Sequence, residues 1–325
     1  MNYELGTSCK LAPAGGIRKN KASSGCLQNY KNHSMYKKII IKERDKYLFN
    51  IGRTWLNTDD NSIGGELFDV RKSWGDFPSD DNDVAFLSFI LEKPSSFSFP
   101  NQIAHLSSLK ALQIPIQFLP LSEEQVPKCL ISLTLDNLSR EEKQTNKRYS
   151  WNPLVKMEKL EYLKILGDDN GHLLGISSEI APNLKWIEVE LFNPKTIHII
   201  KEFKGLEAVV LGEVGNVDVF EFLKHLNLKI ASIKSPKKGF NYTKISYFKS
   251  LEIVRLFSIK EEIDCSMFLK FPHLKELLLY QCKNLKNVEA FLEMPSLKSL
   301  YIADAKGIAR NLKESLGKHI LECEL

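Results

Sequence analysis

The pattern L-x-x-L-x-L recurs along this chain at a nearly constant spacing. Successive copies are separated by 22, 22, 23, 23 and 23 residues, and each begins with leucine: Leu184, Leu206, Leu228, Leu251, Leu274 and Leu297. A pattern that holds its phase over six copies indicates a repeat architecture, in which each copy buries its apolar face against its neighbours. The chain is therefore expected to stack repeats side by side rather than to fold around one central core.

Weaker copies extend the same frame toward the N-terminus, beginning at Leu160, Leu130, Leu109 and Phe86. The step from Leu130 to Leu160 is 30 residues, longer than the others. The excess lies in the polar stretch 139–148, which we expect to form a surface loop because its composition is typical of loops.

The copy from Leu274 to Leu285 has leucine at 274, 277, 279 and 285 and cysteine at 282, and it resembles the full repeat of the leucine-rich-repeat family. The resemblance covers about residues 84–325, and Phe99–Leu112 is similar to the intracellular bacterial and plant subtypes. It implies an α/β fold, a leucine-rich-repeat solenoid with parallel β-strands on its concave face and irregular turns and short helices on its convex face. The other copies lack the family's Asn or Cys, so we expect an incomplete hydrogen-bonded ladder; this position is occupied by Gln117, Leu138, Asp168, Phe192, Val214, Pro236, Ile259 and Ala305.

A second regularity supports the frame. Seven copies have an apolar residue six positions before the first leucine, as expected of a returning segment that closes the core from the convex side. These residues are Ile103, Leu154, Ile200, Phe222, Ile245, Phe268 and Phe291. Asn193 followed by Pro194 predicts the start of one such helical segment.

We predict three regions along the chain. Residues 1–34 form a basic leader that is expected to be disordered, and Met35 is an alternative start. Residues 35–83 form an N-terminal cap with short strands at 38–41, 47–51 and 67–70. Residues 84–325 form the solenoid with its C-terminal cap, which consists of a helix from Ile308 to Leu316 and a closing strand within His319–Leu325.

The positive charge of the chain is concentrated at one end. Of the net charge of +5, residues 1–44 carry +7, which leaves −2 for the rest. A slightly acidic body has no general electrostatic attraction for phosphates, so nucleic acid is not the expected partner. No stretch has the roughly 20 apolar residues of a membrane span, and no apolar signal core precedes the repeats, so we expect no membrane association and a cytoplasmic location.

The sequence predicts no catalytic or metal site. Six widely spaced cysteines and seven single histidines form neither zinc-ligand pairs nor a catalytic triad. Turns are the preferred interpretation of Asp80–Asp83 and Asp168–Gly171. Glu188 and Glu190 share one strand face and could in principle act as an acid–base pair, but exposed strands often carry such residues. We therefore expect no enzyme activity and no cofactor.

Strand alternation places offsets two, four and six from each first leucine on the concave face. Aromatic and apolar residues dominate these offsets, and a solvent-facing patch of this kind is typical of a protein-binding surface. Glutamates at the same offsets would give acidic selectivity. The predicted binding residues are Tyr162, Lys164, Trp186, Glu188, Glu190, Ile253, Arg255, Phe257, Glu276, Leu278, Tyr280 and Tyr301. The alternative is that irregular curvature or a cap buries several of them within the chain.

The sequence therefore predicts a non-catalytic protein–protein interaction scaffold, such as an adaptor or an inhibitor, that binds a partner protein on the concave face. The alternative is a nucleic-acid-associated or enzymatic role that uses the basic leader. The identity of the protein partner cannot be obtained from these patterns, because fold-level analogy gives only the general role.

Overall fold

A computed structural model describes residues 67–69, 86–88, 99, 101–107, 109–136, 149–168, 171–305 and 308–325. The chain divides into two units, residues 1–40 and 41–325, and all described residues belong to the second. The predicted leader at 1–34, the strands at 38–41 and 47–51, the turn at 80–83 and the loop at 139–148 lie outside the described residues.

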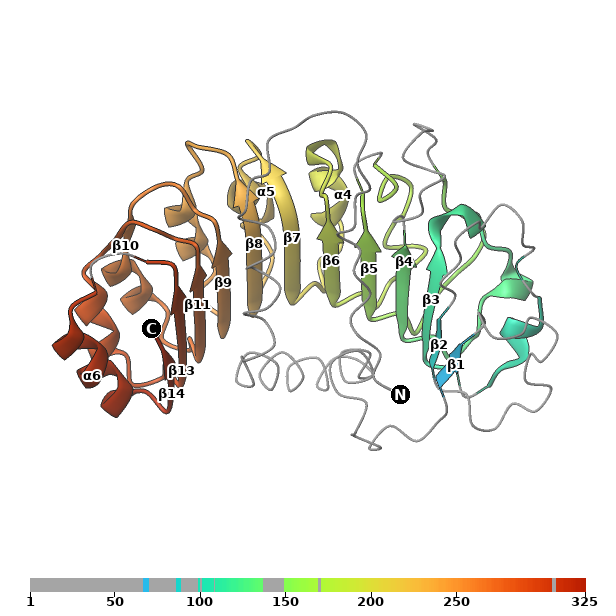
Figure 1. Cartoon of the computed structure of the whole chain (residues 1–325). Coiled ribbons are helices and arrows are strands. Elements are labelled where there is room, and N and C mark those ends of the chain that lie inside the picture. The colour runs from blue at the N-terminus through green and yellow to red at the C-terminus, as the bar shows by residue number, and fades with distance from the viewer. Residues whose placement is uncertain are drawn as a thin grey trace, which may run out of the picture. The chain divides into compact units, whose positions relative to one another are not determined.

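One parallel sheet of 12 strands runs through the described part of the chain, with its strands in sequence order (Figure 1). Its members are β1 (Leu67–Asp69), β2 (Phe86–Ser88), β3 (Ala111–Pro115), β4 (Ser132–Asp136), β5 (Tyr162–Leu166), β6 (Trp186–Glu190), β7 (Ala208–Gly215), β8 (Ile230–Pro236), β9 (Ile253–Phe257), β11 (Glu276–Tyr280), β13 (Ser299–Ala303) and β14 (Glu322–Glu324). A second, two-stranded sheet pairs β10 (Ile263–Asp264) with β12 (Leu285–Lys286). The predicted strand in each copy of L-x-x-L-x-L is confirmed, and β1 within the predicted cap pairs directly with β2.

The register of the sheet repeats from strand to strand. In each repeat from Leu109 to Leu274 the carbonyl oxygen of the residue after the first leucine accepts two N–H groups from the next repeat, as Glu161 does from Lys185 and Trp186. The same pair of bonds joins Ile131 to Glu161 and Tyr162, across the step of 30 residues. The insertion therefore leaves the register unchanged, and β3 to β13 form one continuous sheet.

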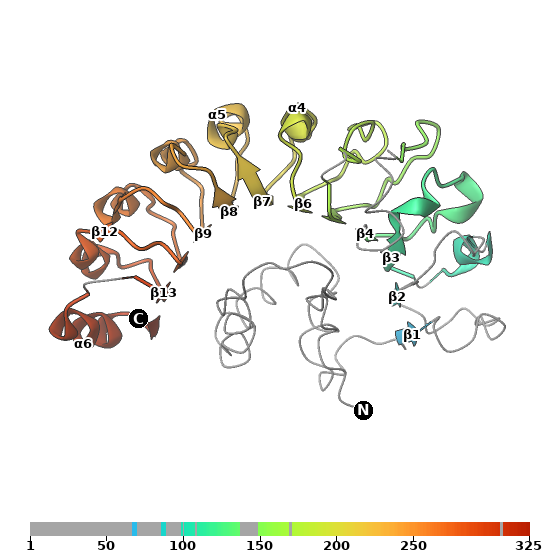
Figure 2. The ribbon, with the colours of Figure 1, turned by 45° about the horizontal axis from the view of Figure 1, so that its top comes forward.

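Short helical segments cover one face of the sheet, and the strands line the inner side of its curve (Figure 2). These segments are η4 (Asn101–His105), η5 (Ile116–Phe118), η6 (Glu123–Gln125), η8 (Pro194–Thr196), α4 (Ile197–Ile200), α5 (Val219–Leu223), η9 (Tyr242–Tyr247), η10 (Cys265–Lys270) and η11 (Val288–Glu293). As predicted, the Asn193 side chain accepts a hydrogen bond from the Lys195 N–H at the start of η8. Between strands and helices lies one continuous core, to which the strands β3 to β9, β11 and β13 contribute alternate residues such as Ile187 and Val189.

The outer segments close this core, with two departures from the prediction. Five of the seven apolar residues six positions before the strand motif are fully buried, but Leu154 and Phe222 are 85% and 45% exposed. Their neighbours Val155 and Leu223 are buried instead. In α5 one position corresponds to about 100° around the helix axis, so Leu223 faces the core and Phe222 faces outward.

Each repeat from Leu184 onward has a residue with left-handed backbone at or near the end of its strand in the large sheet. The φ angles lie between 50° and 59°, seven residues after the first leucine: Leu191, Glu213, Ser235, Ser258, Gln281 and Asp304. In the preceding repeat Gly167 has this role, with φ of 97°. The sequence did not reveal this turn, because five different kinds of side chain at six positions occupy a conformation that usually favours glycine.

Charges alternate along the other margin of the sheet, one residue after the first leucine of the six repeats from Leu160 to Leu274. Lys185 pairs with Glu161 at 2.8 Å, Lys229 with Glu207 at 2.7 Å, and Lys275 with Glu252 at 2.5 Å. We call this row the charge ladder. Each pair joins neighbouring repeats, but its exposure limits the stabilisation to about 0.2–1 kcal/mol.

The C-terminal elements agree with the prediction. Helix α6 (Arg310–His319) precedes β14, which pairs with β13 at the end of the sheet. Buried apolar side chains replace the family's Asn at several positions, including Phe192, Val214 and Ile259. These side chains cannot form a polar ladder.

Candidate functional site

The face of the sheet opposite the helices carries the predicted binding residues, and we call it the inner face. The strand register places Tyr162 beside Trp186, Lys164 beside Glu188, and Arg255 beside Leu278. The apolar side chains of this face are buried but do not belong to the continuous core, unlike their alternate neighbours in the same strands. The sheet therefore has a second apolar side, separate from the side that holds the repeats together.

On β5 and β6 the side chains form a compact cluster. The rings of Tyr162 and Trp186 lie 5.7 Å apart, and the Tyr162 hydroxyl donates to Glu188 Oε2 at 2.8 Å. Lys164 Nζ donates to Glu188 Oε1 at 2.6 Å and lies 3.8 Å from Glu190 Oε1. The two glutamates therefore share one ammonium group, so neither is an isolated acid.

A second cluster covers β8 to β11. Lys234 Nζ lies 5.6 Å from the centre of the Phe257 ring, and this ring lies 6.0 Å from that of Tyr280. Arg255 Nε donates to Glu276 Oε1 at 2.8 Å, and both side chains are buried. A buried ion pair contributes little net stability, but removing one partner leaves an uncompensated charge.

Small residues on β7 separate the two clusters. The inner face carries Ala208, Val210 and Gly212 there. A Cβ atom at Gly212 would lie 3.4 Å from the Glu190 Cα atom and 3.5 Å from the Leu191 nitrogen, which is ordinary van der Waals contact with the adjoining strand.

The predicted binding residues differ in exposure. Lys164, Glu190 and Tyr280 are partly exposed, whereas the other nine are buried; Trp186, for example, is 1% exposed. The prediction that this face is open to solvent is thus not met at these nine positions. Part of the reason is lateral packing, because side chains on neighbouring strands lie close enough for ring and ion-pair contacts.

Three polar residues on the inner face of β3 and β4 were not among the predicted ones. Gln113 Oε1, Ser132 Oγ and Thr134 Oγ1 are buried and accept or donate no hydrogen bond. A buried polar group without a partner costs about 1–3 kcal/mol, and such groups often have a functional reason. Sequence alone could not find them, because Ser, Thr and Gln at a strand face usually reach water.

The repeat motif and the strands coincide one to one, with a parallel strand, an outer segment and a left-handed turn in each 22- or 23-residue unit. The chain thus folds as a leucine-rich-repeat solenoid. No family model matches it, and no curated protein matches it.

Solved structures with a similar fold are leucine-rich-repeat proteins of low sequence identity. An internalin, InlF, from Listeria monocytogenes is 13% identical, with 74% of this chain and 64% of that chain covered and a TM-score of 0.35. A leucine-rich-repeat protein of Leptospira interrogans is 16% identical, with 75% and 72% covered and a TM-score of 0.38. TLR13, in a complex with a single-stranded RNA, is 18% identical, with 68% and 33% covered and a TM-score of 0.39. The fold assignment rests on the repeats of the chain itself.

One buried acid, Asp168, lies on the turn side of this solenoid. Asp168 Oδ1 accepts a hydrogen bond from the Leu173 N–H at 2.8 Å, and Oδ2 accepts one from the Thr196 hydroxyl at 3.3 Å. Burial raises the pKa of Asp168 from 3.8 to about 7, although these hydrogen bonds favour the charged form. Asp168 also begins the predicted turn, through the bond from the Gly171 N–H to its carbonyl oxygen. Its carboxyl group therefore joins two repeats internally.

The buried thiols have little chemical reactivity. Burial raises the pKa of Cys265 to about 12 and that of Cys282 to about 11, so both remain unionised near neutral pH. Within the described ranges no cluster of His, Cys, Asp and Glu could hold a metal ion, and no helix there is long and apolar enough to cross a membrane.

Proposed function

We propose that this leucine-rich-repeat chain is a non-catalytic scaffold that binds a partner protein across its inner face. The observation that carries the proposal is the second apolar side of the sheet, where aromatic, apolar and ion-paired residues of successive repeats lie in rows outside the core. Interfaces are rich in aromatic residues and arginine at their centre, and this composition occurs in both clusters.

Lys164, Glu190 and Tyr280 are the positions for first contact, because they are the partly exposed members of the predicted set. The buried members, such as Trp186 and Arg255, would be reached only as their surroundings rearrange. Association that requires rearrangement is slower than rigid docking, so we expect an association rate constant below the usual range of about 10⁵–10⁷ M⁻¹s⁻¹.

A cytoplasmic location is part of the proposal. Cys265, Cys282 and Cys323 are free thiols, which agrees with a reducing compartment. The basic leader supplies the alternative, a nucleic-acid-associated role.

Site-directed photo-crosslinking tests the inner face. A photoreactive phenylalanine analogue replaces Tyr280 in one protein and Tyr247 in another; Tyr247 is 44% exposed on the outer segment η9. We expect a discrete crosslinked partner from position 280 in cells, and its loss when Glu190→Lys is added. Thermal melts of both proteins verify the fold.

Equal crosslinking from positions 247 and 280 would show that the inner face has no special role. Deletion of residues 1–34 provides a second arm. A partner that still binds after this deletion supports binding by the repeats. Loss of a salt-sensitive interaction supports binding by the basic leader.

A further inference from the structure

Lysines recur at one position in consecutive repeats, nine residues after the first leucine. Lys237, Lys260 and Lys283 occupy it in the described residues, and Lys306 continues the series in the sequence. All three are exposed, and no described residue forms an ion pair with them. With Lys234 and Lys238 they form what we call the lysine margin.

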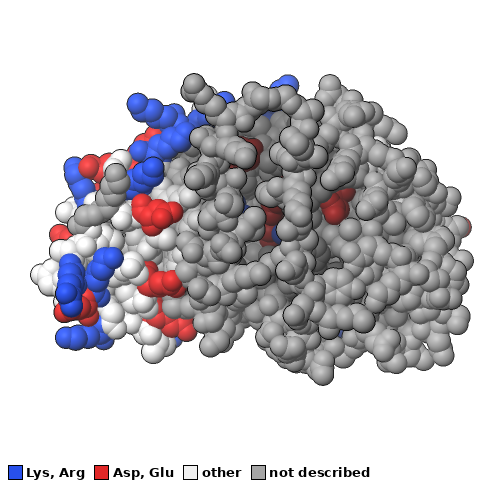
Figure 3. Space-filling model, in the orientation of Figure 1, with Lys and Arg blue, Asp and Glu red and all other residues white. Residues whose placement is uncertain are grey.

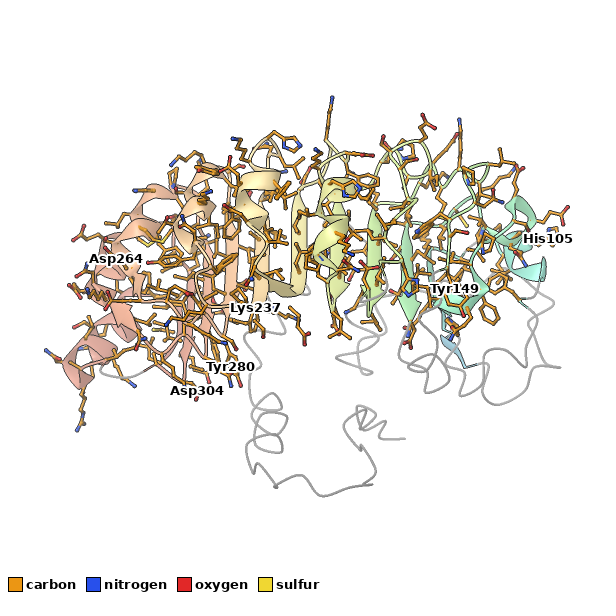
Figure 4. All side chains as sticks on the ribbon, turned by 90° about the horizontal axis from the view of Figure 1, so that it is seen from above. His105, Tyr149, Lys237, Asp264, Tyr280 and Asp304 are labelled. Atoms are coloured by element: carbon orange, nitrogen blue, oxygen red, sulfur yellow. The ribbon has the colours of Figure 1, made fainter. Side chains whose placement is uncertain are left out.

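The lysine margin lies where the strands β8, β9 and β11 end. Each left-handed turn carries the chain out of its strand two residues before the lysine, at Ser235, Ser258 and Gln281. Lys and Arg side chains gather above the carboxyl ends of these strands in Figure 3. Lys237, Tyr280 and Asp304 lie toward the same side of the sheet in Figure 4. The repeated turn thus fixes a row of cations along one edge.

Nearby acids neutralise little of this charge. The Glu261 carboxylate accepts a hydrogen bond from the Gly239 N–H, and Glu262 pairs with Lys286 at 2.6 Å. The repeats on either side have acids at the left-handed position, Glu213 and Asp304. Within the described residues the margin is therefore a patch of three repeats with an acid at the left-handed position on either side.

We infer that the lysine margin binds an extended acidic segment of a partner protein, one that carries several Asp or Glu side chains. Alternate side chains of an extended chain are about 7 Å apart, and neighbouring strands are about 4.8 Å apart, so carboxylates on such a segment can meet lysines of successive repeats. Lysine acts as a flexible point charge, which suits carboxylates that are not held in one geometry.

The margin fits a protein segment better than a nucleic acid. Single-stranded nucleic acids bind on grooves that combine cations with exposed aromatic rings. Here Phe257 is only 6% exposed, and Tyr280 is partly exposed. Residues 45–325 carry a net charge of −2, so the attraction is local. Apart from Lys234, the margin lies outside the inner-face rows, so this inference does not depend on the proposed function.

A fluorescein-labelled decaglutamate peptide serves as the probe, with the full chain and anisotropy at two salt concentrations. The margin variant is Lys237→Glu/Lys260→Glu/Lys283→Glu. The matched control, Lys156→Glu/Lys159→Glu/Lys204→Glu, makes the same change of net charge at exposed lysines elsewhere. We expect binding about tenfold weaker in the margin variant and less than twofold weaker in the control, since reversal of rim charges weakens steered association.

Lysine acetylation followed by mass spectrometry locates the peptide independently of the basic leader. We expect the peptide to protect Lys237, Lys260 and Lys283 but not Lys156 or Lys204. Equal weakening in the two triple variants, or no protection of the margin, would overturn the inference. A (dT)12 oligonucleotide that binds more tightly than the peptide and depends on the margin would also overturn it, in favour of a nucleic-acid surface.

Discussion

Replacing Asp168 by asparagine should remove a pH-dependent loss of stability. The buried carboxyl of Asp168 has a pKa of about 7, against 3.8 for the ordinary group. The folded state thus holds the proton more tightly than the unfolded chain, so the contribution of Asp168 is most favourable below pH 3.8 and is lost as the pH rises toward 7. A pKa difference of about 3 corresponds to about 4 kcal/mol, of which roughly 2.5 kcal/mol falls between pH 5 and pH 8.

Asparagine retains part of the contacts of the acid, because the backbone N–H groups of His172 and Asn193, which also bond the carboxyl group, lose an acceptor where the amide nitrogen replaces an oxygen. Its oxygen can accept from the Leu173 N–H and its amide can donate to the Thr196 hydroxyl, whereas no charge needs to be buried. We therefore expect Asp168→Asn to be more stable than the native chain at pH 8, with a smaller difference at pH 5. Asparagine also matches the family's repeat at this position.

Urea denaturation at pH 5, 6, 7 and 8 measures this difference for the native chain and the variant. Subtracting the two free energies of unfolding at each pH isolates Asp168 from buried His172. Asp304→Asn, on an exposed side chain, is the control and should leave the pH dependence unchanged. If the native and Asp168→Asn curves run parallel from pH 5 to pH 8, the reasoning about burial is wrong.

Three other predictions concern single features of the fold. Glu213→Gly should raise the free energy of unfolding by about 1 kcal/mol, because glycine adopts the left-handed backbone without strain. Glu202 does not have left-handed backbone, so Glu202→Gly should lower the free energy of unfolding by a similar amount. Urea denaturation tests whether the two changes have opposite signs. Arg255→Met should cost about 3–5 kcal/mol by leaving Glu276 unpaired, and adding Glu276→Leu should restore most of the loss; a double variant no more stable than the single one would contradict this. Cys282 should not react with a thiol reagent at pH 8 until the chain unfolds, since burial raises its pKa to about 11; rapid labelling in the native state would be inconsistent with that burial.

The repeat frame could be predicted from the sequence because the same short leucine pattern occurs in every repeat. Leucines that must face the core recur with the length of the repeat, and the strands begin where Leu184 and Leu274 predict. The orientation of the outer segments was less accessible. The pattern does not reveal a rotation by one position, as at Phe222, because both Phe222 and Leu223 are apolar.

The sequence predicted which residues of the candidate site are neighbours, but it did not predict how deeply they are buried. Strand alternation placed Tyr162 beside Trp186 correctly, since it depends only on the pleat. Burial depends on what packs above the face, which no spacing encodes. The polar atoms of Ser132 and Thr134 that lack a hydrogen-bond partner show the same limit. No sequence pattern indicates whether a hydroxyl group on a strand faces water or is buried.

The charge ladder restricts how this protein can change its length during evolution. Glutamate and lysine alternate from Glu161 to Lys275, so loss of a single repeat would bring two like charges face to face, whereas loss or duplication of two restores the alternation. A change by two repeats therefore preserves every ion pair of this stretch, whereas Lys298, which follows Lys275 in the next repeat, marks the point where the alternation ends.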